Sequence, residues 1–367
     1  MKSVIKFRLY PNKSQRRELF RQFDKHCELY NYCRNERIET YKLTKTSPSC
    51  IDQIKSNVSK FKDKTNVSSL QQTVRRVDKS FQNFFRRIKH KQTLGFPRYK
   101  KRLNSIDFTA RDGIKIINNE YKRKLKLYVQ HVGNIKMIAH RSLSTNAYSR
   151  VTIKYQNGQF FASFIINSPI KTLPLNEKSI GLDFGLKTFI TTSDGNKIDN
   201  PKFLKRNLKR LKQTASKRDK YEKGSHIRNK KNRIVRNIYR KITNQRSDFN
   251  HKLANNFIEN YGTIIVENLD LRKLSDTEIS NVNRTYNDVS WEQFSRMLQY
   301  KAANAGRQFV RVNPRNTSKT CHGCGKIHDL TLNDRTFTCQ SCGYEQDRDI
   351  NAARNILTLG LQSLRLT

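Results

Sequence analysis

The sequence predicts a multidomain protein of mixed α+β and α/β class. Three observations lead to this prediction. The 367 residues are enough for two or three domains. Apolar residues recur at strand spacing in some segments and at helical spacing in others. Four of the seven cysteines lie near the C-terminal end as two close pairs. The hydrophobic fraction of 35% is sufficient for several modest cores, though poor for one large core.

The charge of the chain points to a polyanionic partner. Lys and Arg number 74 against 30 Asp and Glu, which gives a formal net charge of +44 at pH 7. Such a charge repels itself in a compact protein unless phosphates neutralise it. No stretch approaches the roughly 18 consecutive apolar residues of a membrane span. The first eight residues include Lys2, Lys6 and Arg8, where a signal peptide would have its apolar core. We therefore expect a cytoplasmic protein with nucleic acid, and no membrane, as its partner.

The N-terminal half begins with a strand and continues into helices. Residues 4–10 alternate in polarity and end at Pro11, as a half-buried strand does. Helical spacing follows over about 13–44, and a Ser/Thr/Lys-rich connection covers about 43–66. The segment Ser68–Lys91 is a long amphipathic helix, because its apolar residues step by three and four.

The segments after residue 105 are β-rich, then mixed. Asn157-Gly158 between two apolar runs predicts a hairpin within 105–170. A domain boundary is expected between Pro169 and Pro174. The following expected elements are a hairpin over 180–192, two basic helices broken near Gly224, a buried strand over 263–268, a helix over 291–305, a strand over 308–312 and a last helix over 349–357.

The four clustered cysteines predict a structural zinc site. Cys321 and Cys324 are followed, after fourteen residues, by Cys339 and Cys342, and a glycine follows each pair. Two such knuckles place four thiolates around one tetrahedral ion and leave no coordination position for a substrate. The alternatives are two redox dithiols or unpaired cysteines. His322 and His328 are interpreted as ordinary polar residues of this module.

Three acids lie at the edges of expected elements. Asp183 is on a strand that starts a hairpin, Glu267 ends an apolar strand, and Asp349 starts the last helix. Carboxylates from separate elements can hold the two Mg²⁺ ions that phosphodiester hydrolysis uses, so the set suits an RNase H-like nuclease site. Each acid also has a structural interpretation: a turn residue, a strand end, and a helix N-cap, for which Asp347 is an equal candidate.

Several motifs of this chain resemble the TnpB family, the RuvC-type nucleases of insertion sequences that are related to compact type V CRISPR effectors. The resemblance covers nearly the whole chain. The motifs are Lys6-Phe-Arg-Leu-Tyr-Pro11, Leu70-Gln-Gln-Thr-Val-Arg-Arg-Val-Asp-Lys-Ser-Phe81, Gly95-Phe-Pro-Arg-Tyr-Lys100, Gly181-Leu-Asp-Phe-Gly-Leu-Lys187, Ile265-Val-Glu-Asn-Leu269, Thr317-Ser-Lys-Thr-Cys321 and Arg348-Asp-Ile-Asn-Ala-Ala-Arg-Asn-Ile356.

This resemblance implies an RNA-guided DNA endonuclease encoded by a transposable element. A transposon-derived guide RNA would bind one protein chain, double-stranded target DNA would be the substrate, and the protein would read a short motif beside the target. The implied architecture is an OB-like β-barrel, a helical recognition insert, a RuvC nuclease core and a zinc-ribbon module. Their implied ranges are 1–10 with 111–170, 11–110, 171–315 with 347–367, and 316–346.

Three other functions remain open at this point. A conventional transposase would use the same acids on the same fold, but it would need a module such as a helix-turn-helix to bind its terminal sequence, and none is evident. A catalytically silent RNA-guided DNA-binding protein would be expected to lack an acid. An RNA-binding zinc-ribbon protein would explain the charge and the cysteines and would leave the carboxylates without a role.

The helix over 68–91 carries the candidate nucleic-acid-binding residues. Its exposed flank holds Gln71, Gln72, Arg75, Arg76 and Lys79. Gln can read adenine in a groove, and the cations can hold phosphates. The resemblance places this helix in the insert that helps to read the motif beside the target, so either glutamine is a candidate base reader. An ordinary solvated face is an equally good interpretation.

Overall fold

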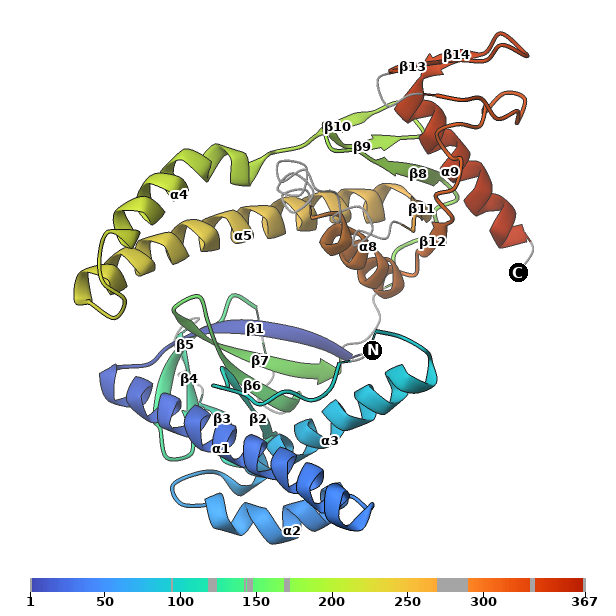
Figure 1. Ribbon diagram of the computed structural model, residues 1–367. Helices are drawn as coiled ribbons and strands as arrows, with labels where there is room; N and C mark the ends of the chain where they lie inside the picture. Colours follow the sequence, from blue (N-terminus) through green and yellow to red (C-terminus); the bar gives the residue numbers. More distant parts are fainter. Residues whose placement is uncertain are drawn as a thin grey trace. The chain divides into compact units, whose positions relative to one another are not determined.

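The computed structural model describes residues 2–93, 95–117, 124–141, 143, 148–167, 172–268, 290–330 and 334–365. The chain forms two compact units, Met1–Ser168 and Pro169–Thr367 (Figure 1). Among the described helices, none is both long and apolar enough to cross a lipid bilayer.

The first unit is built on a curved, nearly closed antiparallel sheet (Figure 1). The strand order is β2-β6-β7-β1-β5-β4-β3. The strands are β1 (Lys2–Tyr10), β2 (Ser105–Thr109), β3 (Ile114–Ile117), β4 (Lys124–Val129), β5 (Gly133–Ile138), β6 (Tyr148–Gln156) and β7 (Gln159–Asn167). The N-terminal strand pairs with both β5 and β7, and Phe7 and Leu9 on its inner face are buried in the core. Asn157 and Gly158, both with positive φ, form the predicted turn between β6 and β7.

The strand β2 lies where the sequence predicts a β-rich segment, beginning at residue 105. It also falls within 11–110, the range that the resemblance implies for the helical insert. Ile106 and Phe108 alternate with polar residues and are fully buried, and β2 pairs with β6 along its whole length.

Three helices complete the first unit: α1 (Lys13–Thr44), α2 (Cys50–Phe61) and α3 (Val67–Lys89). The short helix α2 lies where a Ser/Thr/Lys-rich connection was predicted. It begins with a capping box, in which Ser49 and Asp52 each satisfy the other's backbone N–H. Its buried Val58 packs into the apolar core shared with α1 and α3, and this packing holds a polar helix in place.

The second unit contains a mixed five-stranded sheet of order β10-β9-β8-β11-β12. The strands are β8 (Ser179–Phe184), β9 (Thr188–Thr192), β10 (Lys197–Asp199), β11 (Thr263–Glu267) and β12 (Gln308–Val312). Strand β11 lies between β8 and β12 and runs parallel to both, whereas β9 is antiparallel to its neighbours β8 and β10. The C-terminal ends of β8 and β11 therefore meet at one edge of the sheet.

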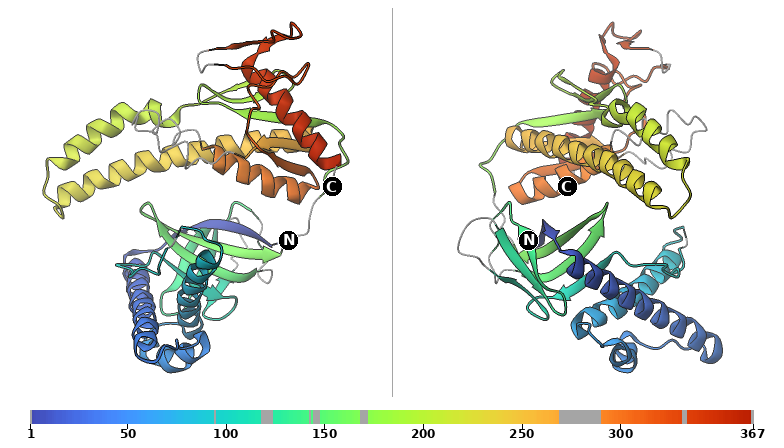
Figure 2. Two further views of the ribbon diagram at one scale, coloured as in Figure 1. Left: turned by 45° about the vertical axis from the view of Figure 1, so that its right-hand side comes forward. Right: turned by 90° about the vertical axis from the view of Figure 1, so that its left-hand side faces the viewer.

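Four helices are described in this unit: α4 (Phe203–Asp219), α5 (His226–Asn260), α8 (Trp291–Ala305) and α9 (Arg348–Arg365). The predicted break at Gly224 is confirmed between α4 and α5, where this glycine has a φ of +98°. The last helix continues eight residues past its predicted end at Leu357 and packs on the sheet (Figure 2). A small sheet of β13 (Thr336–Thr338) and β14 (Glu345–Asp347) precedes it.

Candidate active site and four-cysteine module

Three acids line one cavity in the second unit. Asp183 is the penultimate residue of β8, Glu267 is the last residue of β11, and Asp349 lies in the first turn of α9. All three border a cavity of about 520 Å³, together with the β8–β9 turn and the segment Pro314–Lys319. The structure thus brings together acids that are 84 and 82 residues apart in the sequence.

The close approach of α9 to β8 places Asp349 beside Asp183. A Cβ atom at Gly181 would lie 2.2 Å from the backbone oxygen of Ala353 and 2.7 Å from the backbone nitrogen of Leu357. Only glycine permits this distance between strand and helix. A glycine two residues before the acid is therefore needed for the acids to meet.

Asp347, and not Asp349, caps the helix. Its Oδ1 accepts hydrogen bonds from the backbone N–H groups of Asp349 (3.1 Å) and Ile350 (3.3 Å), and its Oδ2 pairs with Lys197 at 2.6 Å. Between the two capping candidates, the structure selects Asp347. The side chain of Asp349 is consequently left to border the cavity.

The charged form of Asp183 is destabilised by burial and by the two other acids. Burial raises the pKa of Asp183 well above its ordinary value, and the negative charges of Glu267 and Asp349 raise it further, while Arg348 acts in the opposite direction. Burial also raises the pKa of Glu267, against a hydrogen bond from Thr317 that lowers it. Concentrated negative charge of this kind attracts cations.

Thr317 borders the cavity, and no role for it was predicted from the sequence. Its buried hydroxyl donates a hydrogen bond to Oε1 of Glu267 at 2.5 Å. The bond orients the carboxylate at the end of β11. The only sequence signal for Thr317 was its position at the start of the Thr317–Cys321 motif. A metal knuckle does not itself require a buried threonine beside it, so the burial of Thr317 indicates a separate role.

Two asparagines of α9 hold this same segment. Asn355 donates from Nδ2 to the carbonyl oxygens of Thr317 (2.9 Å) and Thr320 (2.7 Å). Asn351 donates to Thr320 (2.8 Å) and accepts from the backbone N–H of His322 (3.0 Å). Both asparagines are buried and lie one helical turn apart, which is the spacing that aligns them on one face. The helix that carries Asp349 therefore also fixes the segment that holds Glu267.

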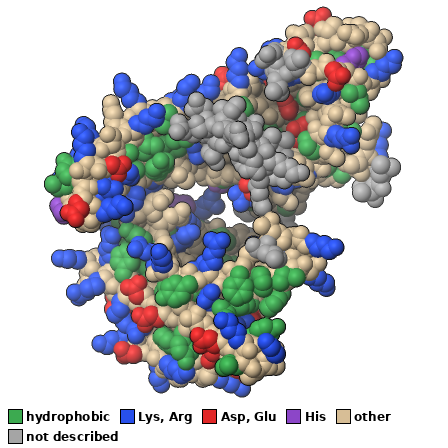
Figure 3. Space-filling view, viewed as in Figure 1, with side chains coloured by type: hydrophobic (Ala, Val, Ile, Leu, Met, Phe, Trp, Pro, Cys, Tyr) green, Lys and Arg blue, Asp and Glu red, His purple; other side chains and the backbone are tan. Residues whose placement is uncertain are grey.

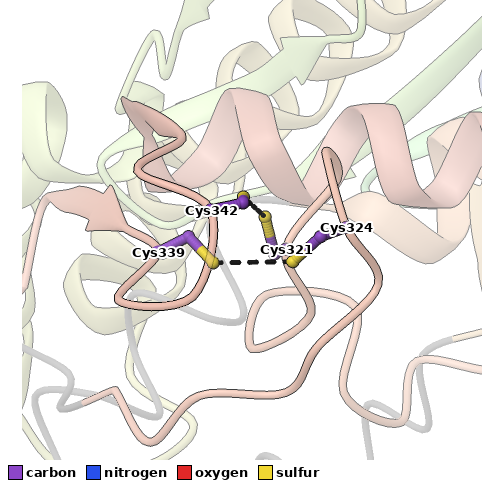
Figure 4. Close-up of side chains that lie close together, drawn as sticks. All are labelled: Cys321, Cys324, Cys339 and Cys342. Carbon is purple, nitrogen blue, oxygen red and sulfur yellow. Dashed lines mark hydrogen bonds between the residues drawn. The ribbon is translucent and has the colours of Figure 1, made fainter.

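The four predicted cysteines converge in space (Figure 4). Their sulfur atoms all lie within 4.8 Å of one another, with Cys321 to Cys342 at 3.7 Å and Cys324 to Cys339 at 3.6 Å. Four sulfurs placed about 2.3 Å from a central ion at tetrahedral angles would be about 3.8 Å apart. The spacing matches one four-coordinate site.

The environment of the cysteines suits metal-bound thiolates. The glycines that follow each knuckle, Gly325 and Gly343, have φ of +76° and +74° and donate backbone hydrogen bonds to the carbonyl oxygens of the first cysteines. Nε2 of His328 lies 3.1 Å from the sulfur of Cys339. His328 thus stands outside the cluster as a hydrogen-bonding neighbour, which is the arrangement that supports a ligating sulfur.

The residues predicted on α3 divide into two kinds. Arg76 makes an ion pair with Asp107 at 2.6 Å and donates to the carbonyl oxygen of Ser105 at 2.7 Å. In this arrangement the guanidinium joins α3 to β2, and its role as a phosphate anchor stays a prediction. Arg75 and Lys79 are exposed, while Gln71 and Gln72 are half-buried.

Three family models match the chain. Residues 163–278 match a model described as "Probable transposase" of the OrfB IS605 type, and residues 291–356 match the TNB domain of Cas12f1-like proteins. Residues 1–46 match a model described as a helix-turn-helix domain. In the described residues of that range, the structure has the strand β1 and the single 32-residue helix α1. One strand and one helix do not form a helix-turn-helix, so the described part of residues 1–46 does not provide the DNA-binding module that a conventional transposase would need.

The similar proteins agree with these matches. A protein of Streptomyces pristinaespiralis named as an RNA-guided DNA endonuclease is 30% identical, over 98% of this chain and 90% of its own length. The Escherichia coli protein InsQ, which carries the same description, is 28% identical over 79% of this chain and 74% of its own length.

The fold has a solved counterpart. Cas12f1, in a cryo-EM structure with guide RNA and target DNA, aligns with a TM-score of 0.63 at 15% identity and covers 97% of this chain and 98% of its own. That likeness concerns the fold alone, and the sequence similarity decides the family. The chain belongs to the TnpB family of RNA-guided DNA endonucleases.

Proposed function

We propose that this chain is the RNA-guided DNA endonuclease of an insertion sequence and that the acid-lined cavity of the second unit hydrolyses target DNA. The observation that carries the proposal is the convergence of Asp183, Glu267 and Asp349, from two strands and a helix, on one cavity. The order of the five-stranded sheet supports an RNase H-like (RuvC) core, since the acids stand at the C-terminal ends of neighbouring parallel strands β8 and β11 and on the packed helix α9.

The cavity fits divalent metal ions. Its donors are carboxylate oxygens, the hard ligands that Mg²⁺ prefers. The raised pKa of Asp183, caused by burial and by the charges of the other two acids, marks negative charge that a cation would compensate. Two Mg²⁺ ions held by these acids would activate water and stabilise the leaving oxygen. Thr317 would keep the carboxylate of Glu267 in one orientation.

The same cavity has cationic residues that suit a phosphodiester. Lys187, Lys319 and Arg348 are among the residues that line it. A DNA strand entering the cavity would bring phosphates toward these cations, while its scissile phosphate faces the acids. Binding and hydrolysis are thereby divided between two sets of side chains.

The four cysteines are proposed to bind one structural Zn²⁺ per chain. Four thiolates would fill the tetrahedral coordination of the ion and leave no position for a substrate. The metal would therefore stabilise the fold of residues 316–346 and take no part in hydrolysis. In the first unit, we propose the sheet as the OB-like barrel and the helices as the recognition insert. Gln71 or Gln72 remains the proposed base reader, with Arg75 and Lys79 as phosphate anchors.

Charge supports the RNA and DNA partners. Residues 202–252, which include α4 and most of α5, hold 19 Lys or Arg against three acids. A basic surface of this extent fits the backbone of a guide RNA and its duplex with DNA. We propose one protein chain per RNA.

The test is cleavage by purified protein loaded with the RNA of its own element. Target DNA with a randomised flank should be cut in Mg²⁺ and left intact in EDTA. Asp183→Asn, Glu267→Gln and Asp349→Asn should each abolish cutting and retain RNA and DNA binding. Asp199→Asn is the matched control, because Asp199 is an exposed acid of the same unit outside the cavity. Cutting at the wild-type rate by an acid variant would refute the site, and binding without cutting by the wild type would favour the silent DNA binder.

A further inference from the structure

The C-terminal end of α3 and the segment after it carry exposed aromatic and aliphatic side chains. Phe85 is 60% exposed, and Ile88 and Phe96 are each 46% exposed. Phe85 and Ile88 are three residues apart on α3 and therefore share a face of the helix. We call Phe84, Phe85, Ile88 and Phe96 the aromatic patch.

The patch is a row of rings that extends from the core to solvent. Phe81 is buried in the core between α1 and α3, and its ring lies 5.9 Å from that of Phe96. The ring of Phe84 is 5.1 Å from Phe96 and 5.4 Å from Phe85. The inner rings hold the outer ring of Phe85 in place. A fixed, exposed aromatic ring is a binding platform, since little conformational entropy is lost when a flat ligand stacks on it.

The charged residues of the segment that carries the patch are all Lys or Arg. Between Asp78 and Asp107 the chain has nine Lys or Arg and no acid. The last turn of α3 alone contributes Arg86, Arg87 and Lys89. The guanidinium of Arg34 lies 5.9 Å from the ring of Phe96, so a cation from α1 borders the patch as well. In the space-filling view, hydrophobic side chains on the unit that carries α3 lie among Lys and Arg side chains, with fewer Asp and Glu side chains between them (Figure 3).

We propose that the aromatic patch stacks unpaired nucleobases of the bound RNA, while the cations beside it hold the neighbouring phosphates. Rings interleaved with positive charge are the pattern of single-stranded nucleic-acid binding. A segment with nine cations and no acid suits a polyanion better than it suits a protein surface of mixed charge. Among nucleic acids, RNA is favoured, because it is the partner present before any target arrives, and an exposed apolar patch needs its cover in the resting complex. The proposal rests on the proposed function, in so far as that function supplies an RNA.

Location can be tested by crosslinking. The chain is expressed with its element's RNA in cells supplied with 4-thiouridine, purified, irradiated and digested, and peptides that carry uridine are identified by mass spectrometry. A crosslink at Phe85 or Phe96 is expected. Uridine crosslinked elsewhere on the chain, with none at these residues, would overturn the proposal.

Affinity can be tested with matched variants. The co-purified RNA is sequenced, transcribed and bound again to RNA-free protein. Phe85→Ala should weaken binding about tenfold, as loss of one base–ring stack does, without changing the salt dependence. Phe85→Tyr should restore it. Lys89→Ala should lower the salt dependence by about one charge. Leu43→Ala is the control, because Leu43 is an 84% exposed apolar residue at the end of α1.

The outcomes separate this inference from the proposed function. RNA binding by Phe85→Ala within twofold of wild type would overturn the aromatic patch, even if the protein cuts DNA. Unchanged RNA binding with weaker capture of target DNA, or a dimer that Phe85→Ala dissolves in light scattering, would overturn it in favour of another occupant. Failure of the wild type to cut, with a tenfold effect of Phe85→Ala on RNA binding, would instead refute the nuclease and leave the stacking role intact.

Discussion

Gly181→Ala should inactivate the proposed nuclease without unfolding the chain. The new Cβ would lie 2.2 Å from the carbonyl oxygen of Ala353, whereas ordinary contact begins at 3.4 Å. Strand and helix must therefore separate by about 1.2 Å, because the two nearest atoms of α9 belong to its backbone and cannot rotate away. Asp349 stands four residues before Ala353 and would move with the helix. A displacement of about 1 Å of a reacting group can cost about 100-fold in rate.

The assay is single-turnover cleavage of target DNA in saturating Mg²⁺, with RNA binding measured on the same preparation. We expect cleavage to fall about 100-fold and RNA affinity to stay within twofold. Gly323→Ala is the control, because a Cβ there would meet Tyr344 only at 3.5 Å. Cleavage by Gly181→Ala within threefold of wild type would show that the distance between β8 and α9 does not set the position of Asp349.

Three further predictions concern single residues. Thr317→Val removes the hydrogen bond that lowers the pKa of Glu267, so cleavage should fall roughly tenfold at neutral pH and the acidic limb of its pH profile should move to higher pH; an unchanged limb would contradict this role. Cys342→Ser should release the metal, measured as zinc per chain, and should loosen residues 316–346 in hydrogen exchange; wild-type protein without zinc would refute the assignment. Burial lowers the pKa of His26 from 6.5 to about 4, so the neutral ring stabilises the first unit at pH 7, and this stability, about 3 kcal/mol, should be lost as the pH falls from about 6.5 toward 4. Hydrogen exchange of α1 and α3 should show this loss in the wild type and a flatter pH dependence in His26→Gln.

The elements that the sequence predicted well are those with one strong local signal. The long helices α1 and α3 have apolar residues at helical spacing over more than 20 residues, and the β6–β7 hairpin has Asn157-Gly158. The helix α2 was missed because its signal is a capping box within a polar segment. Its stability comes from packing against α1 and α3, which are distant in sequence.

The candidate site was predictable in its members and not in its connections. The acids lie at or near the ends of elements and the cysteines have a distinctive spacing, so pattern alone marked them as candidates. Thr317, Asn351 and Asn355 are ordinary polar residues, and their roles depend on hydrogen bonds between α9 and a segment more than 30 residues earlier. Arg76 shows the converse. Its sequence position resembles that of an exposed cation, and only the fold places Asp107 beside it.

The four-cysteine module joins the second unit through two residues that also serve the acids. The chain enters it beside Thr317, which holds Glu267, and leaves it through Asp347, which caps the helix of Asp349. The residues between these two positions are therefore attached to the second unit at two fixed ends. Residues of the module that neither line the acid cavity, as Lys319 does, nor contact α9 can therefore change in number and sequence without moving the carboxylates. Thr317 and Asp347 themselves cannot change in this way, because a substitution at Thr317 would affect Glu267 and one at Asp347 would affect Asp349.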